Sequence, residues 1–425
     1  MNRMIKEKSD KFTAGKKALI VEENSAVPID KRVWYEATTL RDAGWDVAVL
    51  CPTERAAPDS NGSQRMYTRE TLEGVTVYRF PLVRAQGVVG YLREYLSAFL
   101  SIARAAWRIW RGSRFDVIHF CNPPDLFSPI AIFYRLLGVS VVFDHHDLFP
   151  ELILWRYQGL TARILYAIAR LGEYLTFRSA NAVISTNESY RQVALDRGKV
   201  PAERVVVVRN GPKRDQFVPV DPVPSLKRGF SYMVAYAGVM GPEDGVTELM
   251  QTVRYIVQDL GRRDILFVLL GDGALRARAQ ADLASWGLED MVDFPGMIRD
   301  DILLRQYLCT ADVLLSPEPL TPLNLRSTFI KVGEYMALGK PIVAYKLPET
   351  QHTAQDAALY VEPGDAQAFG RAILALLDDQ RRRQSMGEMG RKRVVECLSW
   401  ESQQAELLRA YRIALDKRAN THPIY

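Results

Sequence analysis

The sequence predicts two α/β domains, each built on a parallel β-sheet. Three observations support this. Short apolar runs alternate with amphipathic segments along the chain, the alternation pauses once near residue 215, and 425 residues are more than one ordinary domain needs. Apolar residues make up 48% of the chain and charged residues 25%, which is typical of a globular protein and excludes a disordered one.

The first domain is predicted over residues 18–215, after a flexible, lysine-rich tail at 1–17 that lacks the apolar centre of a signal peptide. Buried strands are expected at 18–21, 46–51, 75–80, 117–120, 139–143, 182–185 and 205–208. Segments such as 31–42 and 162–178 have the period of amphipathic helices. The β-rich stretch around Val75 is interpreted as a local antiparallel addition.

An Asn-Gly turn at 210–211 and the proline-rich run 218–224 predict a linker over 216–230. The second domain follows over 231–400, with strands expected at 233–236, 265–270, 291–294, 313–315, 341–345 and 358–361. A helix within 401–425 is a candidate to cross back to the first domain. Two such domains would form a cleft at the carboxyl ends of their strands, where ligands bind in this class of fold.

Composition excludes several functions. The four cysteines lie far apart, which argues against a zinc cluster or disulfide framework and fits a reducing, cytoplasmic location. No stretch reaches the roughly 18 apolar residues of a spanning helix. No Gly-x-Gly-x-x-Gly follows the first strand, which disfavours a dehydrogenase. Residues 1–220 carry 31 Lys and Arg against 23 Asp and Glu, which suits an anionic surface or acceptor unless the charges are merely scattered.

One long motif is recognisable: residues 326–344 read RSTFIKVGEYMALGKPIVA and resemble the signature of retaining GT-B glycosyltransferases of family four. Further pieces follow in that family's order, namely DKRVWYEATTL at 30–40, AGWDVAVLCP at 43–52, NPPD at 122–125, DHHDLFPE at 144–151, RNG at 209–211, LGDG at 270–273 and DFPG at 293–296. The nearest branch resembles bacterial surface-polysaccharide transferases of the fucosamine-transferase type. The resemblance spans about residues 18–415.

The resemblance implies a GT-B fold, with two Rossmann-like parallel-sheet domains facing across a cleft. It implies retaining transfer of a hexosyl or N-acetylhexosaminyl unit from a UDP- or GDP-sugar to a glycan or lipid-linked acceptor, in surface polysaccharide or glycoconjugate biosynthesis. The nucleotide sugar is then a substrate, with no resident cofactor and no nucleic-acid partner. Three departures are visible. Arg326 stands where the family has its first acidic residue, the stretch 238–245 lacks the usual Arg and Lys clamp, and 23–26 lacks a glycine pair.

The donor site is expected on the helix of that motif. Ser327 and Thr328 stand where the helix should begin, so its free N–H groups and positive dipole end would face the diphosphate. Lys331 lies one turn further, and Glu334 shares its face. The resemblance implies that Glu334 binds the ribose hydroxyls. The alternative is an ordinary capped helix with solvated charges.

Two other segments are expected at the donor site. The turn holding Gly271 and Gly273 follows a strand and permits close approach of backbone to nucleotide, although such turns are common. The resemblance implies that Met297 lines the base pocket through its backbone. Because the chain contains no Asp-x-Asp, we expect no metal.

Catalytic candidates follow the strand at 139–143. The resemblance implies that His146 contacts the transferred sugar, and that retention proceeds by front-face attack without an enzyme nucleophile. Asp147 is the candidate to fix the His146 tautomer. His145 and His146 are two of only five histidines, although an ordinary hydrogen-bonded loop histidine is the alternative for either.

The segment 90–112 is predicted to be a helix with aromatic bulk and a basic stripe. Spacing places Arg93, Arg104, Arg108 and Arg111 on one side, and Trp107 and Trp110 supply aromatic bulk. This pattern suits peripheral contact with the anionic inner face of a membrane. The alternative is a core helix with a solvated basic face.

Two other functions remain open from the sequence. A sugar-nucleotide epimerase can use the same two-domain fold, but needs paired acid and base groups and no acceptor site. A catalytically silent sugar-nucleotide-binding scaffold would explain the departure at Arg326 and the missing clamp.

Overall fold

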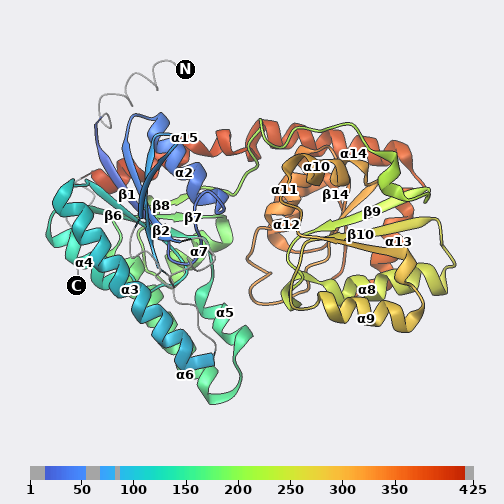
Figure 1. The fold of residues 1–425 in the computed structure, drawn as a ribbon, viewed down its shortest axis with the longest axis horizontal. Helices are drawn as coiled ribbons and strands as arrows, with labels where there is room; N and C mark the ends of the chain where they lie inside the picture. Colours follow the sequence, from blue (N-terminus) through green and yellow to red (C-terminus); the bar gives the residue numbers. More distant parts are fainter. Residues whose placement is uncertain (1–14, 54–67, 82–86, 417–425) are drawn as a thin grey trace, which may run out of the picture. The chain divides into compact units, whose positions relative to one another are not determined.

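The computed structural model describes residues 15–53, 68–81 and 87–416, so the predicted tail at 1–17 lies almost wholly outside it (Figure 1). The chain divides into two compact units. Unit 1 contains the residues up to Val208 together with those from Gln404 onward, and unit 2 contains Arg209–Gln403. Each unit has helices packed around a largely parallel sheet, which confirms the predicted fold class.

Unit 1 contains an eight-stranded sheet in the order β3-β4-β2-β1-β5-β6-β7-β8. Every pairing is parallel except that of β3 with β4, which confirms an antiparallel addition beside Val75. The strands are β1 (Lys17–Val21), β2 (Asp46–Pro52), β3 (Thr68–Leu72), β4 (Val75–Phe80), β5 (Val117–Cys121), β6 (Ser140–His145), β7 (Ala182–Ser185) and β8 (Val205–Val207). β5 and β7 are buried along their whole length, because helices cover both faces of the sheet.

The helices of unit 1 come from both ends of the chain. They are α2 (Lys31–Asp42), α3 (Gly87–Gly112), α4 (Ser128–Leu136), α5 (Phe149–Arg156), α6 (Gly159–Ser179), α7 (Glu188–Asp196) and most of α15 (Trp400–Leu415). Asp30 caps α2 by accepting a hydrogen bond from the Val33 N–H at 3.0 Å. α15 joins unit 1 through buried contacts, including an edge-to-face pair of Trp45 and Tyr411 with ring centroids 5.1 Å apart.

Unit 2 contains a six-stranded, fully parallel sheet in the order β11-β10-β9-β12-β13-β14. The strands are β9 (Tyr232–Ala237), β10 (Ile265–Leu270), β11 (Val292–Gly296), β12 (Val313–Ser316), β13 (Ile342–Tyr345) and β14 (Ala358–Val361). Its helices are α8 (Val246–Arg254), α9 (Arg276–Trp286), α10 (Asp301–Thr310), α11 (Ile330–Ala337), α12 (Pro348–Ala354), α13 (Ala366–Leu377) and α14 (Gln380–Arg393). Alternate residues of β9 join two apolar clusters, one on each face.

The segment predicted as a linker belongs to unit 2. Phe217 is buried in one of its apolar clusters. The Val223 N–H donates to the Thr310 hydroxyl at 2.8 Å, and the Val220 N–H donates to the Cys309 thiol at 3.5 Å. These contacts hold the proline-rich run against α10, so the chain leaves unit 1 at Val208 instead of near residue 215.

The sheet order determines which loops meet. β1, β5 and β6 are neighbours, so the segments after them, which include Glu22, Asn122 and His146, converge at one edge of unit 1. In unit 2 the neighbours β10, β9 and β12 bring together Gly271 and Gly238 with the segment after Ser316.

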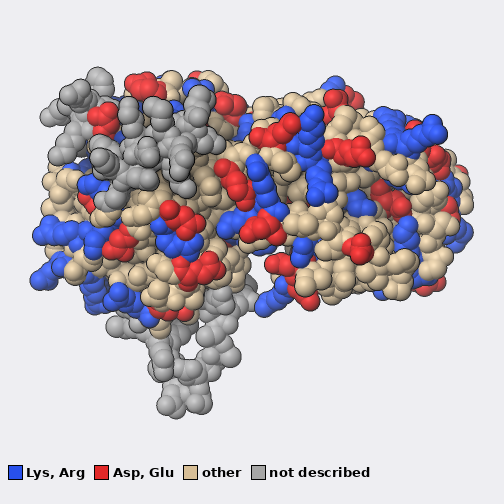
Figure 2. Space-filling model, turned by 90° about the horizontal axis from the view of Figure 1, so that it is seen from above, with Lys and Arg blue, Asp and Glu red and all other residues tan. Residues whose placement is uncertain are grey.

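Two properties of the surface bear on membrane contact. On the face shown in Figure 2, basic and acidic side chains are interspersed over both units, without one large field of a single sign. Among the described helices, none combines the length and apolarity that a membrane-spanning helix requires.

Candidate active site

His146 lies just after β6, and its side chain is 12% exposed. Its neighbour His145, the last residue of β6, is fully buried and packs against the rings of Phe177 and Tyr190, with centroids 4.9 and 5.3 Å away. Burial lowers the pKa of His145 to about 3, so this imidazole is neutral. Of the two adjacent histidines, His145 is therefore a core residue and His146 is the one placed for chemistry.

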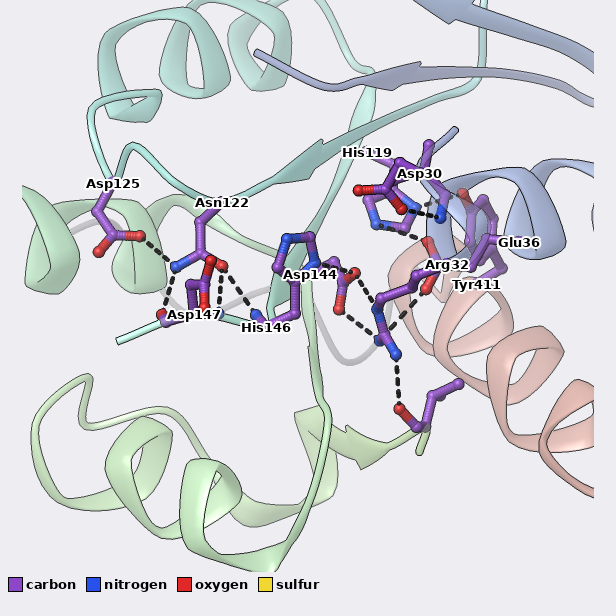
Figure 3. A network of polar contacts seen from close by, with 12 residues as sticks. Asp30, Arg32, Glu36, His119, Asn122, Asp125, Asp144, His146, Asp147 and Tyr411 are labelled. Carbon is purple, nitrogen blue, oxygen red and sulfur yellow. Dashed lines mark hydrogen bonds and ion pairs between the residues drawn. The ribbon is translucent and has the colours of Figure 1, made fainter. Parts of the chain in front are cut away.

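Asp144 is the partner of the His146 ring. Figure 3 shows Asp144 between His146 and Arg32, with His146 Nδ1 3.0 Å from Asp144 Oδ2. Burial alone would lower the pKa of His146, but the charge and hydrogen bond of Asp144 outweigh burial and raise it to about 10. At neutral pH His146 is therefore an imidazolium, and both of its nitrogens are donors.

Arg32 of α2 holds the other side of the Asp144 carboxylate. Its Nε lies 2.7 Å from Asp144 Oδ2 and its Nη2 lies 2.7 Å from Oδ1, a bidentate pair in a fully buried environment. Burial alone would raise the pKa of Asp144, but Arg32 and His146 keep it well below its ordinary value. Asp144 is therefore an anion shared by two cations.

The predicted role of Asp147 needs correction, because the Nδ1 contact of His146 belongs to Asp144. Asp147 is held through its backbone instead. The side-chain oxygen of Asn122 accepts from the N–H groups of His146 and Asp147 at 2.8 and 3.0 Å, and its amide donates to the Asp147 carbonyl at 2.7 Å. Asn122 thus fixes the turn that carries His146 (Figure 3).

The buried polar network extends from Arg32 to the C-terminal helix. Arg32 Nη2 lies 3.3 Å from Glu36 Oε1, and Glu36 Oε2 lies 3.7 Å from His119 Nε2 on β5. His119 Nδ1 meets the Tyr411 hydroxyl of α15 at 2.8 Å. Burial and the Asp144 charge raise the pKa of Glu36 well above its ordinary value, and burial lowers that of His119 to about 4. His119 is therefore neutral at pH 7.

The same place gathers potential metal ligands among the described residues. One atom each of Glu36, His119, Cys121 and Asp144 lies within 4.8 Å of the others, all fully buried. Arg32 already supplies a cation to both carboxyl groups of this set. Since a metal ion would be repelled by that guanidinium, the donor set fits Arg32 better than a metal.

In unit 2 the helix of the recognised motif begins later than predicted. α11 starts at Ile330, with Phe329 as its capping residue, so Ser327 and Thr328 lie in the preceding loop. The Ser327 hydroxyl donates to the Leu323 carbonyl at 3.0 Å, and the Arg326 N–H donates to the same carbonyl at 3.0 Å. This local turn delays the helix, because it occupies the hydroxyl that would otherwise cap it.

Lys331, in the first turn of α11, is already paired. Its ammonium lies 2.6 Å from Glu318 Oε1 and 3.1 Å from the Tyr236 hydroxyl, and it sits 4.3 Å from the centre of the Tyr236 ring. Burial alone would lower the pKa of Lys331, but Glu318 reverses the effect and raises it. Lys331 therefore stays charged, with Glu318 as a counter-ion that the sequence motif did not predict.

The glycine-rich loops of unit 2 pack against one another beside Lys331. A Cβ at Gly271, where φ is +130°, would lie 1.9 Å from the Gly238 carbonyl oxygen, and one at Gly238 would lie 2.8 Å from the Lys331 ammonium. At Gly273 a Cβ would lie 2.6 Å from the Met240 backbone. These glycines are required by their own neighbours, and their contact with a nucleotide stays a prediction.

Three other residues singled out in the sequence also lie in unit 2. Glu334 is half-buried on α11, one turn after Lys331. Arg326 donates to the Pro322 carbonyl at 3.2 Å, so it closes a turn in the place of the acidic residue that the resemblance led us to expect. Met297 follows β11 and is 65% exposed.

The predicted basic helix exists as α3, but only part of its aromatic face is accessible. Arg93, Arg104, Arg108 and Arg111 are all exposed, and Trp107 is 39% exposed. Trp110 is buried, with its ring 3.6 Å from the Arg114 guanidinium and packed edge-to-face on Tyr134. Trp110 is therefore a core residue, which corrects its assignment to a membrane interface.

Family comparisons agree with this architecture. The profile described as "Glycosyl transferase 4-like domain" matches residues 29–211, and the one described as "Glycosyl transferases group 1" matches residues 231–379. The chain belongs to the group 1 glycosyltransferases. Each matched region covers the strands and helices that carry the candidate residues of one unit. The assignment to this family is therefore supported by both units.

Individual relatives of this glycosyltransferase vary in acceptor. A 2-deoxystreptamine glucosyltransferase from Streptomyces kanamyceticus is 27% identical over 72% of the chain and 79% of its own length. A chitobiosyldiphosphodolichol beta-mannosyltransferase from Candida glabrata is 21% identical over 79% and 77%. Among solved structures, the sucrose-phosphate synthase of Thermosynechococcus elongatus superimposes with a TM-score of 0.71 at 20% identity, covering 93% of this chain and 98% of its own. That match supports the GT-B fold.

The sequence reasoning missed Arg32, Glu36, Asn122, Asp144 and Glu318. The first four lie inside stretches that were quoted for the resemblance, yet their roles depend on contacts made across the sheet. A usable signal existed in DHHD at 144–147, since a carboxylate on either side of the histidines offers two possible partners.

Proposed function

We propose that the chain is a retaining, metal-independent glycosyltransferase. It moves a hexosyl or N-acetylhexosaminyl unit from a UDP- or GDP-sugar to a glycan or lipid-linked acceptor. Surface polysaccharide or glycoconjugate biosynthesis, of the fucosamine-transferase type, is the process that we propose. The observation that carries the proposal is Lys331 with Glu334 on one face of α11, beside a backbone platform of glycines, in a chain of this family.

Unit 2 supplies the donor chemistry in this proposal. The leaving diphosphate needs positive charge, and the Lys331 ammonium together with the first N–H groups of α11 provides it without a metal. Glu318 must then share or release Lys331 as the donor enters, since its oxygen lies 2.6 Å from the ammonium. Glu334 accepts hydrogen bonds from the ribose hydroxyls, a bidentate contact suited to a carboxylate.

Unit 1 supplies the groups around the transferred sugar. His146 donates to an oxygen of the transferred sugar, and this fixed positive charge favours the transition state. It is not the base. Asp144 is not a nucleophile either, because it is fully buried and both of its oxygens are bonded to Arg32 and His146. The proposal therefore keeps front-face attack by the acceptor, without a covalent enzyme intermediate.

The acceptor side is proposed to lie at an anionic membrane. Besides the exposed arginines of α3, α6 carries an exposed apolar stripe, with five large residues at helical spacing: Leu160 at 73%, Ile164 at 53%, Ile168 at 55%, Leu171 at 59% and Leu175 at 41% exposure. Contiguous apolar surface of this kind is uncommon on monomeric soluble proteins. Arginines with an apolar stripe favour peripheral binding to the inner face of the membrane over binding of a neutral partner.

Turnover of labelled sugar nucleotides tests the proposal. A thermal-shift screen of UDP- and GDP-sugars first identifies the donor, because a ligand that binds only the folded state raises apparent stability. The donor is then incubated with and without lipid-linked acceptor. We expect transfer with retention only when the acceptor is present. Interconversion of the donor without acceptor would indicate an epimerase, and binding without any turnover would indicate a silent scaffold.

A further inference from the structure

The Asp144 carboxylate is bonded to two cations at once. The guanidinium of Arg32 takes both oxygens at 2.7 Å, and the His146 ring takes one of them at 3.0 Å. The carboxylate is fully buried, so water does not compete for it. This arrangement fixes which His146 nitrogen faces inward, namely Nδ1, and leaves Nε2 as the nitrogen available to a substrate (Figure 3).

We propose that Asp144, which Arg32 holds in place, is a positioning residue that keeps His146 doubly protonated, so that the ring acts as a fixed hydrogen-bond donor and never as a base. The inference rests on the proposed transfer function and deepens it. Nδ1 donates to Asp144, and Nε2 donates to an oxygen of the transferred sugar.

The Arg32 side chain that holds Asp144 has further partners of its own. Arg32 also donates to the Val208 carbonyl at 3.0 Å and lies 3.3 Å from Glu36, so its guanidinium has little freedom to leave Asp144. Glu36 in turn meets His119, which is bonded to Tyr411. The guanidinium is thus fixed between α2, β6 and the end of β8. These contacts leave Asp144 Oδ2 facing the His146 ring.

The groups around His146 determine the sign of the effect. Acidic groups facing it favour the imidazolium and cationic groups oppose it. Six titratable groups interact electrostatically with His146. They are Asp144, His145 and Asp147 in β6 and the turn after it, Glu22 at the end of β1, Glu36 of α2 and His119 of β5. Arg32 is the opposing cation. Asp144 alone among them is hydrogen-bonded to the ring, which supports a pKa near 10.

The experiment measures the titration of His146 directly. The histidine Cε1–H resonances are followed by NMR from pH 5 to 8.5 in the full chain, with His146→Gln identifying the resonance. We expect the wild-type resonance not to titrate in this range. In Asp144→Asn, with Arg32 still nearby, it should titrate at or below roughly pH 6.5. Titration of wild-type His146 near pH 6.5, or no change in Asp144→Asn, would overturn the proposal.

The pH–rate profile gives a second readout. Because wild-type His146 stays protonated between pH 5.5 and 8, its titration should not change the wild-type transfer rate in this range. Relative to wild type, the transfer rate of Asp144→Asn should fall at least about tenfold from pH 5.5 to pH 8, since few of its His146 rings stay protonated at pH 8. Arg32→Gln should lower kcat with little change in donor KM and leave the profile flat, because it loosens Asp144 but removes a repulsive cation.

Two variants serve as controls. Asp264→Asn makes the same substitution in another bidentate pair, where Arg262 holds Asp264 at 2.8 and 3.1 Å in unit 2, and should change neither readout. The double variant Arg32→Gln with Asp144→Asn removes both charges together and carries the test if Asp144→Asn does not fold. Because the NMR titration needs no turnover, failure of this inference is distinguishable from failure of the proposed transfer activity.

Discussion

Around His146 in unit 1 a long network of buried side chains is joined by hydrogen bonds, whereas Lys331 in unit 2 has two side-chain partners, Glu318 and Tyr236, beside loops that meet through their backbone. The unit 1 network connects residues as far apart as His119 and Tyr411, which are separated by 292 positions. In unit 2, Gly238, Gly271 and Gly273 allow loops to touch, and one ion pair holds Lys331. The difference teaches that unit 1 holds the charged His146 ring in place by side-chain contacts, while unit 2 uses glycines to let its backbone loops pack closely.

The comparison predicts that removing the shared carboxylate has the largest effect. Asp144→Ala leaves the buried guanidinium of Arg32 without its anion, so the free energy of unfolding should fall by about 3–5 kcal/mol. Urea unfolding followed by circular dichroism measures the loss. The matched control is Asp264→Ala, which removes a more exposed pair and should change stability by about 1 kcal/mol or less. Similar losses in both variants would erase the contrast between the units.

Glu334→Ala should act on binding and leave stability nearly unchanged. Loss of a charge-assisted contact to the ribose should weaken donor binding by about 1.5–3 kcal/mol. Isothermal titration with the donor found by the screen measures it. Glu362→Ala, which removes an exposed glutamate of the same unit, is the control and should bind normally. Unchanged affinity in a folded Glu334→Ala protein would remove Glu334 from the donor site.

The α3 arginines should contribute separately from the donor site. Each should add roughly 1 kcal/mol of attraction to anionic lipid, fading as salt rises. We expect co-sedimentation with anionic vesicles at low salt and none with neutral vesicles. Replacing Arg93, Arg104, Arg108 and Arg111 with glutamine should abolish binding while donor affinity persists. Equal binding by both proteins would make the stripe a solvated face.

The α6 stripe sharpens the same experiment. Ile164→Gln with Ile168→Gln should weaken vesicle binding that remains at high salt, because the apolar contribution is not screened. The matched control is Leu96→Gln with Leu100→Gln on α3. If both pairs have the same effect, the apolar contact is not confined to α6.

The smallest expected effect is that of metal removal. If Lys331 and the start of α11 neutralise the diphosphate, excess EDTA should leave transfer unchanged. Loss of activity in EDTA that magnesium or manganese restores would show that the diphosphate is held in another way.

Much of the architecture could be predicted from the sequence, because apolar periodicity and the Gly and Pro residues that mark turns are local features of the chain. The described strands of both units other than β3, and helices such as α2, fall where apolar periodicity placed them, since a buried parallel strand needs a short apolar run. The start of α11 was misplaced by two or three residues, because the Ser327 hydroxyl bonds the Leu323 carbonyl instead of capping the helix. That competition cannot be read from spacing.

The site was less predictable, and for a different reason. Lys331 and Glu334 share one helix, so their spacing places them on one face. The partner of His146 is Asp144, and this carboxylate is held by Arg32, which lies 112 positions away in the sequence. Trp110 resembles an interfacial tryptophan in the sequence, but its burial depends on Tyr134 of α4. Likewise, the linker prediction did not anticipate that α10 holds residues 220–223.

The return of α15 to unit 1 affects the order in which the protein matures on the ribosome. His119 is made early, but its partner Tyr411 emerges 292 residues later, which at about 5–20 residues per second is roughly 15–60 s. Unit 2 is continuous in sequence and is complete before that point. Until then, His119 Nδ1 of β5 lacks the Tyr411 hydroxyl as its hydrogen-bond partner. Nearly the whole chain must therefore be translated before this buried hydrogen bond can form.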